Sequence, residues 1–395
     1  MGGSSVVAYT GLSTGNLPYR FSPSQAVEYG ASRYVFYINS SSDLVYKKST
    51  NRGKSWSSPV NIHVSTVARC AIWFDRWTPG DTGTVVHIWD IDDVSDDVAY
   101  FSLDISTDTL GNGGTPITVF AGATTSTSTT QLTGAKARGG NLLCVFNLDG
   151  GTEIGSYRST DAGATWGARA DANEVAEDFY LLFPGNEADS QDMWLVYWDT
   201  SANEISLKVY DDSADSWGET SISGSMTEVS QTTAYSQMAG SIRASDNHLL
   251  LVAWNAYDSA TGDLNTWDIN GAASITAKTD VVTNSDDCIL AHLAVAPNGT
   301  VHCTYAGKSD GSQTAKTALG IYRKSSNDGM ATWTAEYTVN ADYIDAVCAL
   351  TGAQQSEGSF PLICWSNDTL GGSSAGLLSA AYQTAAPRVA SMIGV

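Results

Sequence analysis

The sequence predicts an all-β fold, a single seven-bladed β-propeller built from four-stranded antiparallel blades. The first observation is a short apolar run ending in an aromatic residue, which recurs seven times at a spacing of about 50–60 residues. The second is a composition with 37 Gly, 12 Trp and only 9 Pro, which is typical of short strands joined by tight turns. The seven runs are Tyr34–Tyr37, Val85–Trp89, Leu142–Phe146, Met193–Trp198, Leu249–Trp254, Val301–Tyr305 and Pro361–Trp365.

Each run is predicted to be the second strand of its unit. Another short apolar run precedes it across a turn containing Gly or Asn, as in Leu290–Gly299. A polar loop, a third run such as Ile205–Tyr210, and a fourth run that Trp often opens come after it. Propeller blades pack on both of their faces, which explains why the second runs are apolar at nearly every position rather than at alternate ones.

Seven such units account for the chain as one domain, 1–395, and no linker divides it. The last unit shows three clear strands, so we expect the N-terminal segment 5–10 to supply its fourth strand and close the ring. The C-terminal segment Arg388–Ile393 is the alternative for that place. The expected blades are approximately 24–64, 67–120, 129–173, 177–224, 236–283, 287–340 and 343–384.

The charge of the chain excludes several classes of partner. Lys and Arg number 20 against 42 Asp and Glu, which gives a formal net charge of -22. This field repels phosphate, so neither nucleic acid nor an anionic membrane surface is expected as a partner. No apolar run reaches the roughly 18 residues that a membrane span needs, and Met1–Ser5 lacks the features of a signal peptide.

The six cysteines lie singly in apolar runs, without the C-x-x-C spacing of a zinc site. They are expected to be small buried side chains. Two of them, Cys348 and Cys364, flank a polar loop and are expected to face each other as neighbouring thiols or as one disulfide.

A second repeat lies between the third and fourth strands of four units. Its copies are Ser159–Trp166 (STDAGATW), Ser49–Trp56 (STNRGKSW), Ser325–Trp333 (SSNDGMATW, one residue longer) and the degenerate Asp212–Trp217. The Asp or Asn side chain is expected to accept backbone N–H groups, Gly to take a positive φ, and Trp to fill the gap between blades. The residues assigned to this structural role are Ser159, Asp161, Gly163, Trp166, Asn51, Gly53, Trp56, Asn327, Gly329 and Trp333.

This repeat resembles the Asp-box, or BNR repeat, S-x-D-x-G-x-T-W, of sialidase-like propellers. The resemblance implies a sialidase-like fold over the whole chain, with the boxes lying away from the active face. Sialidases also carry an early Arg that binds the substrate carboxylate, and Tyr19-Arg20 stands at the matching place, although a chance Tyr-Arg pair is the alternative. The rest of the catalytic set does not follow, because the family's long acid/base loop is here only Asn39–Ser42, followed by Asp43.

The starts of the predicted innermost strands define the expected mouth of the propeller. A single cation stands there, so an anionic sugar would meet a neutral-to-negative surface. We predict ligand contacts from Gln25, Arg69, Gln131 and Gln237. If the protein is an enzyme, Arg20, Arg69, Asp178, Asp286 and Asp345 are the catalytic candidates. Two carboxylates across a cleft suffice for a glycosidase, and Asp178, Asp286, Asp287, Asp342 and Asp345 supply them unless they form a solvated rim.

One loop concentrates carboxylates. Like charges so close are costly unless they are solvated or bridged by a cation, so the loop is either a solvated acidic turn or a Ca²⁺ site, since hard oxygen ligands suit that ion. No other cofactor is expected. The five carboxylates are Asp90, Asp92, Asp93, Asp96 and Asp97.

The sequence favours a non-catalytic structural or binding propeller. Its Ser/Thr/Gly-rich, Lys-poor composition fits a virion surface or tail-associated protein, in which particle structure or attachment to host glycans is the expected role. The expected partners are other virion or surface proteins and a cell-surface glycan, and the expected location is the virion surface or the extracellular space. A sialidase-like glycoside hydrolase and an assembly factor are the alternatives.

Overall fold

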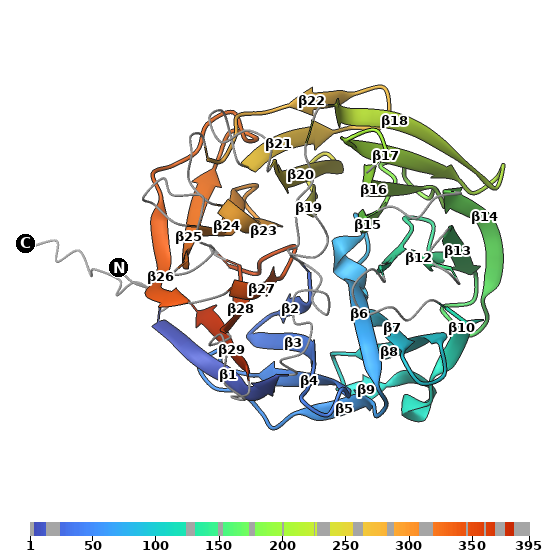
Figure 1. Ribbon diagram of the computed structural model, residues 1–395, viewed down its shortest axis with the longest axis horizontal. Coiled ribbons are helices and arrows are strands. Elements are labelled where there is room, and N and C mark those ends of the chain that lie inside the picture. The colour runs from blue at the N-terminus through green and yellow to red at the C-terminus, as the bar shows by residue number, and fades with distance from the viewer. Residues whose placement is uncertain are drawn as a thin grey trace, which may run out of the picture.

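A computed structural model describes residues 4–12, 24–123, 131–148, 153–173, 178–199, 201–224, 226, 238–255, 264–282, 288–307, 319–344, 347–358, 361–367 and 376–382. These residues form seven antiparallel sheets that follow one another in sequence order around a central axis (Figure 1). Each sheet contacts the next through its innermost strand, and these contacts pass around the whole ring. Among the described residues, no helix is long and apolar enough to cross a membrane.

The sheets are numbered here by their order along the chain, and their strands are given from the axis outward. Sheets one to three are β2 (Ala26–Tyr29), β3 (Ser32–Ile38), β4 (Leu44–Ser49), β5 (Val60–His63); β6 (Val67–Phe74), β7 (Val85–Asp92), β8 (Asp97–Asp104), β10 (Ile117–Ala121); and β11 (Leu132–Lys136), β12 (Leu142–Asn147), β13 (Ile154–Ser159), β14 (Gly167–Asn173). Sheets four and five are β15 (Asp178–Pro184), β16 (Met193–Asp199), β17 (Glu204–Asp211), β18 (Ser216–Gly224); and β19 (Met238–Arg243), β20 (His248–Trp254), β21 (Leu264–Ile269), β22 (Ile275–Ala277). Sheets six and seven are β23 (Cys288–Val295), β24 (Val301–Gly307), β25 (Leu319–Ser326), β26 (Tyr337–Ile344); and β27 (Val347–Gly352), β28 (Ile363–Asn367), β29 (Gly376–Tyr382), β1 (Ser4–Leu12).

Sheet two departs from the predicted strand number. A fifth strand, β9 (Thr109–Leu110), pairs with β8 in the register Leu103↔Leu110. The prediction of four strands in every blade is therefore wrong for this sheet. The reason is the connection between β8 and β10, which doubles back on β8 and contains the 3-10 turn η2 (Gly111–Gly114) instead of a tight turn.

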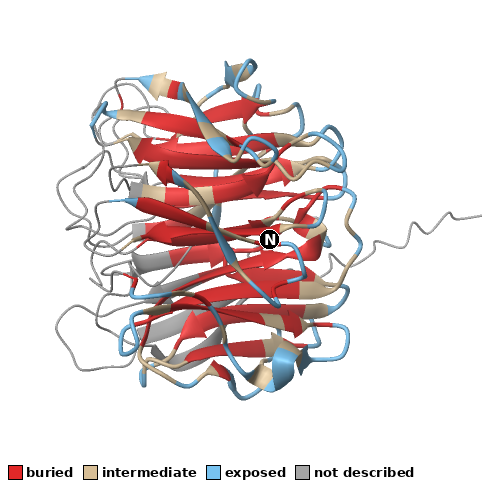
Figure 2. Ribbon diagram, turned by 90° about the vertical axis from the view of Figure 1, so that its right-hand side faces the viewer, coloured by how far each residue is buried: buried red, intermediate tan, exposed pale blue. Residues whose placement is uncertain are grey.

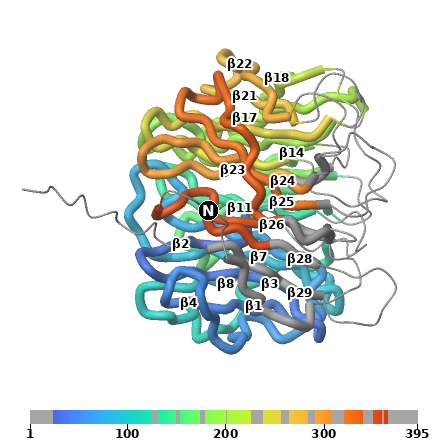
Figure 3. The backbone as a smooth tube through the Cα atoms, turned by 90° about the vertical axis from the view of Figure 1, so that its left-hand side faces the viewer, coloured from blue at the N-terminus to red at the C-terminus, as the bar shows by residue number. Residues whose placement is uncertain are grey.

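The ring closes through the two ends of the described chain. β1 pairs antiparallel with β29 from Ser4↔Tyr382 to Leu12↔Gly376, so the N-terminal segment is the fourth strand of sheet seven. Figure 1 shows β1 beside β29, and Figure 3 shows the ring of sheets edge-on. The alternative segment, Arg388–Ile393, lies outside the described residues.

The second strands carry the centre of the core. Each sheet packs against a neighbour on both faces, so β12 and β20 are apolar without alternation and buried almost throughout. Figure 2 shows buried residues along most of the strands that it draws. Four of the predicted buried cysteines, Cys70, Cys144, Cys303 and Cys364, are buried and free. Cys364 is therefore a thiol and not half of a disulfide.

The repeated turns between third and fourth strands are held by side chains acting on the backbone. In sheet three, the Gly163 N–H donates to Ser159 Oγ at 2.8 Å, and Asp161 accepts the N–H and the hydroxyl of Thr165 at 2.8 and 2.6 Å. Gly163 has a φ of 92°, where a side chain is strained. In sheet one, Asn51 accepts the Ser55 N–H at 2.9 Å in the same way.

The turn of sheet six uses different residues from those predicted. Ser326 Oγ accepts the Met330 N–H at 2.9 Å, and Asp328 accepts from the Thr332 N–H at 3.0 Å and its hydroxyl at 2.6 Å. The turn therefore has the ordinary length, with Met330 in the glycine position at a φ of 69°. The assignment of Asn327 and Gly329 to the Asp and Gly positions is wrong, because the extra serine lies in β25 rather than in the turn.

Tryptophans that follow these turns pack against the preceding sheet. Trp166 lies over Tyr100 of sheet two with ring centroids 5.3 Å apart. Trp217 donates its indole N–H to the carbonyl of Ala170 at 2.9 Å, and Trp333 donates to that of Thr279 at 2.7 Å. Trp217 and Trp333 therefore fill the gap between blades and also satisfy a backbone acceptor in or just after the neighbour's fourth strand. Trp166 instead donates its indole N–H to the Gly163 carbonyl of its own turn at 3.2 Å.

We expect the turn carboxylates to contribute to loss of stability in acid. Hydrogen bonds from the Thr165 and Thr332 hydroxyls lower the pKa values of Asp161 and Asp328 to about 2. A lowered pKa in the folded state stabilises the fold above the unfolded value near 3.8, and this contribution is lost as the pH falls towards 2. Urea unfolding of the double variant Asp161→Asn/Asp328→Asn should depend less on pH in this window than the wild type. An unchanged slope would contradict the assignment.

Candidate functional site

The predicted mouth at the starts of the innermost strands lies only partly within the described residues. Asp178 begins β15 and Asp342 lies in β26. Three predicted ligand-binding residues, Gln25, Arg69 and Gln131, belong to the described residues. The remaining candidates fall outside them and keep their predicted roles: Arg20, Gln237, Asp286, Asp287 and Asp345.

Gln25 and Gln131 connect neighbouring strands through hydrogen bonds. Their exposed fractions are 0% and 5%, and that of Arg69 is 8%. The Gln25 backbone N–H donates to Thr351 Oγ1 of sheet seven at 2.7 Å, and its side-chain Nε2 donates to the Cys70 carbonyl of sheet two at 3.0 Å. The Gln131 N–H donates to Asn147 Oδ1 at 2.6 Å. These hydrogen bonds align neighbouring strands, and the ligand-binding role stays a prediction.

The acidic loop of sheet two does not gather its carboxylates. Asp90 and Asp92 are buried in β7, Asp93 and Asp96 are exposed, and Asp97 is half-buried. No three of the five bring oxygens within 4.8 Å of one another. The structure thus separates the loop into an exposed turn and a buried pair.

A histidine lies at that buried pair. His63 Nδ1 is 2.8 Å from Asp90 Oδ2, and Nε2 is 3.9 Å from Asp92 Oδ2. Burial lowers the pKa of His63, but the hydrogen bond and charge of Asp90 outweigh it, so the pKa lies above its usual value. Burial raises the pKa of the Asp90 carboxyl, whose Oδ1 has no hydrogen-bond partner among the described residues. The sequence gives His63 no metal-ligand spacing and no functional role.

Three carboxylates elsewhere lie close enough together to hold a metal ion. Asp199, Glu204 and Glu219 are the group of this kind that the described residues contain. Their oxygens already have protein donors: Ser201 donates to Asp199 at 2.7 Å, Ser206 to Glu204 at 2.9 Å, and the Tyr197 hydroxyl to Glu219 at 2.5 Å. The three carboxylates therefore act as hydrogen-bond acceptors within sheet four, and a metal ion is not needed to explain why they lie close together.

A pocket of about 260 Å³ opens at the other end of the axis, where the innermost strands end. We name it the axial pocket. Its wall comes from sheets one, two, five, six and seven, through the ends of β2, β6, β19 and β23 and the segment after β27. The residues that line it are Glu28, Phe74, Arg76, Trp77, Ile242, Arg243, Ala244, Ser245, Val295, Ala296, Pro297, Gly299, Gln355, Ser356 and Glu357.

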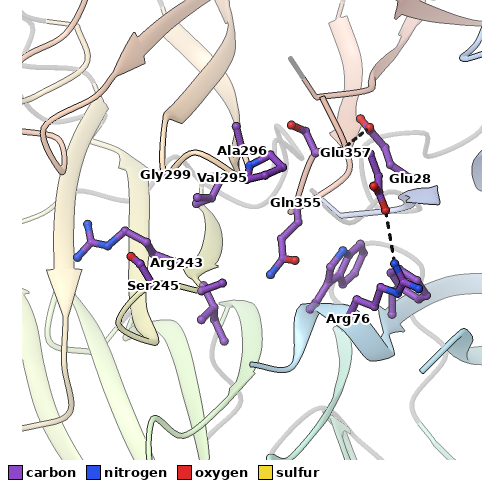
Figure 4. Close-up of a pocket in the computed structure, with 15 residues that line it drawn as sticks. Glu28, Arg76, Arg243, Ser245, Val295, Ala296, Gly299, Gln355 and Glu357 are labelled. Carbon is purple, nitrogen blue, oxygen red and sulfur yellow. Dashed lines mark hydrogen bonds and ion pairs between the residues drawn. The ribbon is translucent and has the colours of Figure 1, made fainter. Parts of the chain in front are cut away.

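The polar groups of the axial pocket lie on opposite sides of it (Figure 4). The Arg76 guanidinium stacks on the Tyr29 ring, 4.7 Å from its centroid, and lies 3.7 Å from the Glu357 carboxylate. The Gln355 side chain reaches into the space between Arg76 and Ser245. Apolar side chains, among them Trp77, complete the wall. The pocket therefore offers both hydrogen-bond donors and hydrogen-bond acceptors beside an apolar surface.

A buried network fixes the segment that carries Arg76. The 3-10 turn η1 (Asp75–Trp77) follows β6, and Asp75 accepts the Val85 N–H at 2.9 Å. Asp75 also lies 3.0 Å from His87 Nε2 and 2.6 Å from Lys136 Nζ. Burial raises the pKa of Asp75, but the hydrogen bond from His87 and the Lys136 contact lower it to about 2. Asp75 is thus ionised at neutral pH and anchors η1 to sheets two and three.

Glu28 closes the pocket wall between the first and last sheets. It is 3% exposed and pairs with Arg33 at 2.9 Å. It also accepts the backbone N–H groups of Glu357 at 3.0 Å and Leu362 at 2.5 Å, both of sheet seven. Burial raises the pKa of Glu28, while the Arg33 charge and the two amides act against that rise.

The charges around the axial pocket are nearly balanced, in contrast to the chain as a whole. Arg243 donates to Asp246 at 2.6 Å and to Asp268 at 2.9 Å. Burial lowers the pKa of Arg243, but these carboxylates outweigh it and raise the net value. Arg76 faces Glu357, as described above. The pocket thus presents paired charges of both signs, and it does not repel a neutral or a weakly anionic ligand.

The sequence predicts none of the residues of the axial pocket. The one available signal is position: Arg76, Arg243 and Gln355 each stand directly at or after the end of a predicted innermost strand. The ligand site was expected at the starts of these strands instead, because the resemblance to sialidase-like propellers implies an active face there.

No family model matches the chain, and no curated protein matches it. Among solved structures, the fold is similar to a polysaccharide lyase described as an ulvan lyase, with a TM-score of 0.58, 9% identity and 95% of each chain covered. A second structure of that lyase, bound to -[GlcA(1-4)Rha3S]-, gives a TM-score of 0.57, also at 9% identity and 95% of each chain. A Trypanosoma rangeli sialidase is more distant, with a TM-score of 0.47, 13% identity, and 74% of this chain and 53% of that chain covered. At these identities the likeness shows the fold alone.

Proposed function

We propose that this protein is a glycan-binding β-propeller and that the axial pocket holds one sugar unit of its ligand. The observation that carries the proposal is the pocket itself, in which Arg76, Gln355, Ser245 and Glu357 converge beside an apolar wall. Ligand sites characteristically combine an apolar lining with a few convergent polar groups. The volume of about 260 Å³ suits a single ring rather than a larger ligand.

The polar groups match the chemistry of a sugar. A guanidinium and an amide are planar and present several donors or acceptors at fixed spacing, so each can engage two neighbouring hydroxyls. Gln355 offers both a donor and an acceptor, and Arg76 is held in place by Tyr29 and Glu357. A pre-positioned side chain loses little conformational entropy when it binds.

Binding without cleavage is the simpler role for this site. We infer a sialidase-like propeller that lacks the sialidase catalytic set, and attachment to a surface glycan, on a virus particle or outside a cell, as the context of binding. The fold similarity to a lyase bound to a polysaccharide supports a glycan ligand at the level of fold only. The His63–Asp90 pair at the opposite face is where cleavage would be sought, since a histidine paired with a carboxylate suits general base catalysis.

The test begins with an array of neutral and uronic oligosaccharides and continues with calorimetric titration of the best binder. We expect Arg76→Ala and Gln355→Ala each to weaken binding by about tenfold or more, because each removes a hydrogen-bonding group worth about 1.5 kcal/mol. Lys54→Ala is the control, since Lys54 is an exposed cation in the turn after β4, on the same face.

Two results would overturn the proposal. One is an array on which no glycan is retained. The other is a bound glycan whose affinity is the same for wild type, Arg76→Ala and Gln355→Ala. Shortening of the bound oligosaccharide, lost in His63→Ala, would assign cleavage instead of binding.

A further inference from the structure

A second pocket, of about 320 Å³, lies between sheets four and five. We name it the interblade pocket. Trp194 of β16 forms part of its wall, and the turn between β21 and β22 borders it through Gly271 and Ala272. A side chain added at Gly271 would lie 3.9 Å from Trp194, so the turn passes close to this indole. Glu187, Asp192 and Glu219 also line the pocket.

At other interfaces, a tryptophan occupies the corresponding place. In sheet three, Arg158 pairs with Gly167, and the residue before Gly167 is Trp166. In sheet four, Val209 pairs with Gly218, and Trp217 precedes it. In sheet six, the Thr334 N–H donates to the Ser325 carbonyl at 2.8 Å, and Trp333 precedes Thr334. In each of these turns, eight residues separate the two paired positions.

Sheet five breaks this pattern in two ways. Asp268 pairs with Thr276, and the residue before Thr276 is Ile275, so an aliphatic side chain stands where the other turns have an indole. The connection between the paired positions is also one residue shorter. Ile275 packs against the core, and the same turn borders the interblade pocket through Gly271 and Ala272.

The preceding sheet has a backbone position that corresponds to the acceptors of the other indoles. Trp217 and Trp333 donate to the carbonyls of Ala170 and Thr279. Ala170 lies three positions after Gly167, the first paired residue beyond the turn of sheet three. Thr279 lies three positions after Thr276, the corresponding residue of sheet five. The same count from Gly218 reaches Ser221, next to the lining residue Thr220.

The charge of the interblade pocket favours a cation. Three carboxylates line it, and no Lys or Arg does. Glu219 is partly compensated by Lys208, whose Nζ is 3.5 Å away, and Asp192 accepts the Asp212 N–H at 3.0 Å. Glu187 has no such partner among the described residues. A positive group beside the bound ring therefore gains a favourable interaction at the rim.

We propose that the interblade pocket binds an aromatic ring the size of an indole that carries a protonated amine. The ring takes the place that Trp166, Trp217 and Trp333 take at other interfaces, and its N–H faces the fourth strand of sheet four. The amine faces Glu187 and Asp192. This site is separate from the axial pocket, so it stands independently of the proposed glycan binding.

The test uses tryptamine as the probe, with saturation-transfer NMR for contact and calorimetry for affinity. We expect wild type to bind tryptamine several-fold more tightly than indole-3-acetate, which has the same ring with a negative charge. Ile275→Trp should lower tryptamine affinity by more than tenfold, because it restores an indole at the position that Trp166, Trp217 and Trp333 hold in the other turns. Ile275→Val, the matched control, should keep the affinity.

Ala272→Leu gives a second variant in case Ile275→Trp does not fold, since it fills the pocket from the exposed turn. Its tryptamine affinity should also fall by more than tenfold. Absence of tryptamine binding to the wild-type protein would overturn the proposal. Equal affinity for tryptamine in wild type and in a folded pocket-filling variant would overturn it as well.

Discussion

Replacing Glu28 by Ala should lower the free energy of unfolding by about 3–5 kcal/mol, the usual cost of removing one partner from a buried ion pair. The change leaves Arg33 without its carboxylate and the amides of Glu357 and Leu362 without their acceptor. These contacts join the first sheet to the last across more than three hundred residues of sequence. Chemical denaturation followed by tryptophan fluorescence measures the effect.

Lys48→Ala is the control for this prediction. Lys48 pairs with Asp108 at 2.5 Å, but both side chains are substantially exposed. Exposed pairs contribute about 0–1 kcal/mol, so this variant should unfold almost as the wild type does. If Glu28→Ala were no more destabilising than Lys48→Ala, the closure of the ring would not depend on Glu28.

Gly163→Ala should destabilise the protein by about 2–5 kcal/mol, because two costs add. The φ of 92° disfavours any side chain, at about 1–2 kcal/mol. The new Cβ would also lie 2.1 Å from the Tyr100 ring of sheet two, a distance that forces the ring or the turn to move. Overpacking of this kind costs about 1–3 kcal/mol more.

Gly122→Ala separates the two costs. Gly122 has a φ of 90°, and a Cβ there would meet nothing within 4 Å. Its alanine variant should therefore show the backbone cost alone, as measured by the same denaturation experiment. Equal destabilisation by the two variants would mean that Tyr100 does not constrain the turn.

Local patterns in the sequence predict the strands well, because each blade is built from residues close together in the chain. The continuous apolar runs identify second strands such as β12 and β20, which pack on both faces. The turn chemistry is equally local, since Asp161 accepts the N–H of Thr165 four residues further along the chain. The fifth strand β9 was missed because two residues give no periodic signal.

Sheet six shows a limit of motif reading. The segment from Ser325 to Trp333 contains two serines and a glycine, so alignment to the pattern places Gly329, which does have a positive φ of 67°, in the glycine position of the turn. The structure instead uses Ser326, Asp328 and Met330, because the strand pairing fixes the length of the turn. The sequence alone fits two alignments of this segment to the turn pattern equally well, and the strand register selects one of them.

The axial pocket could not be predicted from the sequence because its residues meet only when the ring closes. Glu28 and Glu357 contact each other across 329 positions, and Arg76 and Gln355 come from different sheets. No spacing rule connects such residues. The resemblance to sialidases predicts a site at the opposite ends of the same strands. There Gln25 and Gln131 are buried, and their hydrogen bonds hold neighbouring strands together.

The most direct test of glycan binding at the axial pocket is a crystal structure of the protein with the oligosaccharide that it binds. We predict electron density for one sugar ring between Arg76 and Gln355, with hydroxyls within hydrogen-bond distance of both side chains. Sugar density at the opposite face of the propeller, beside the His63–Asp90 pair, with an empty axial pocket, would contradict this account.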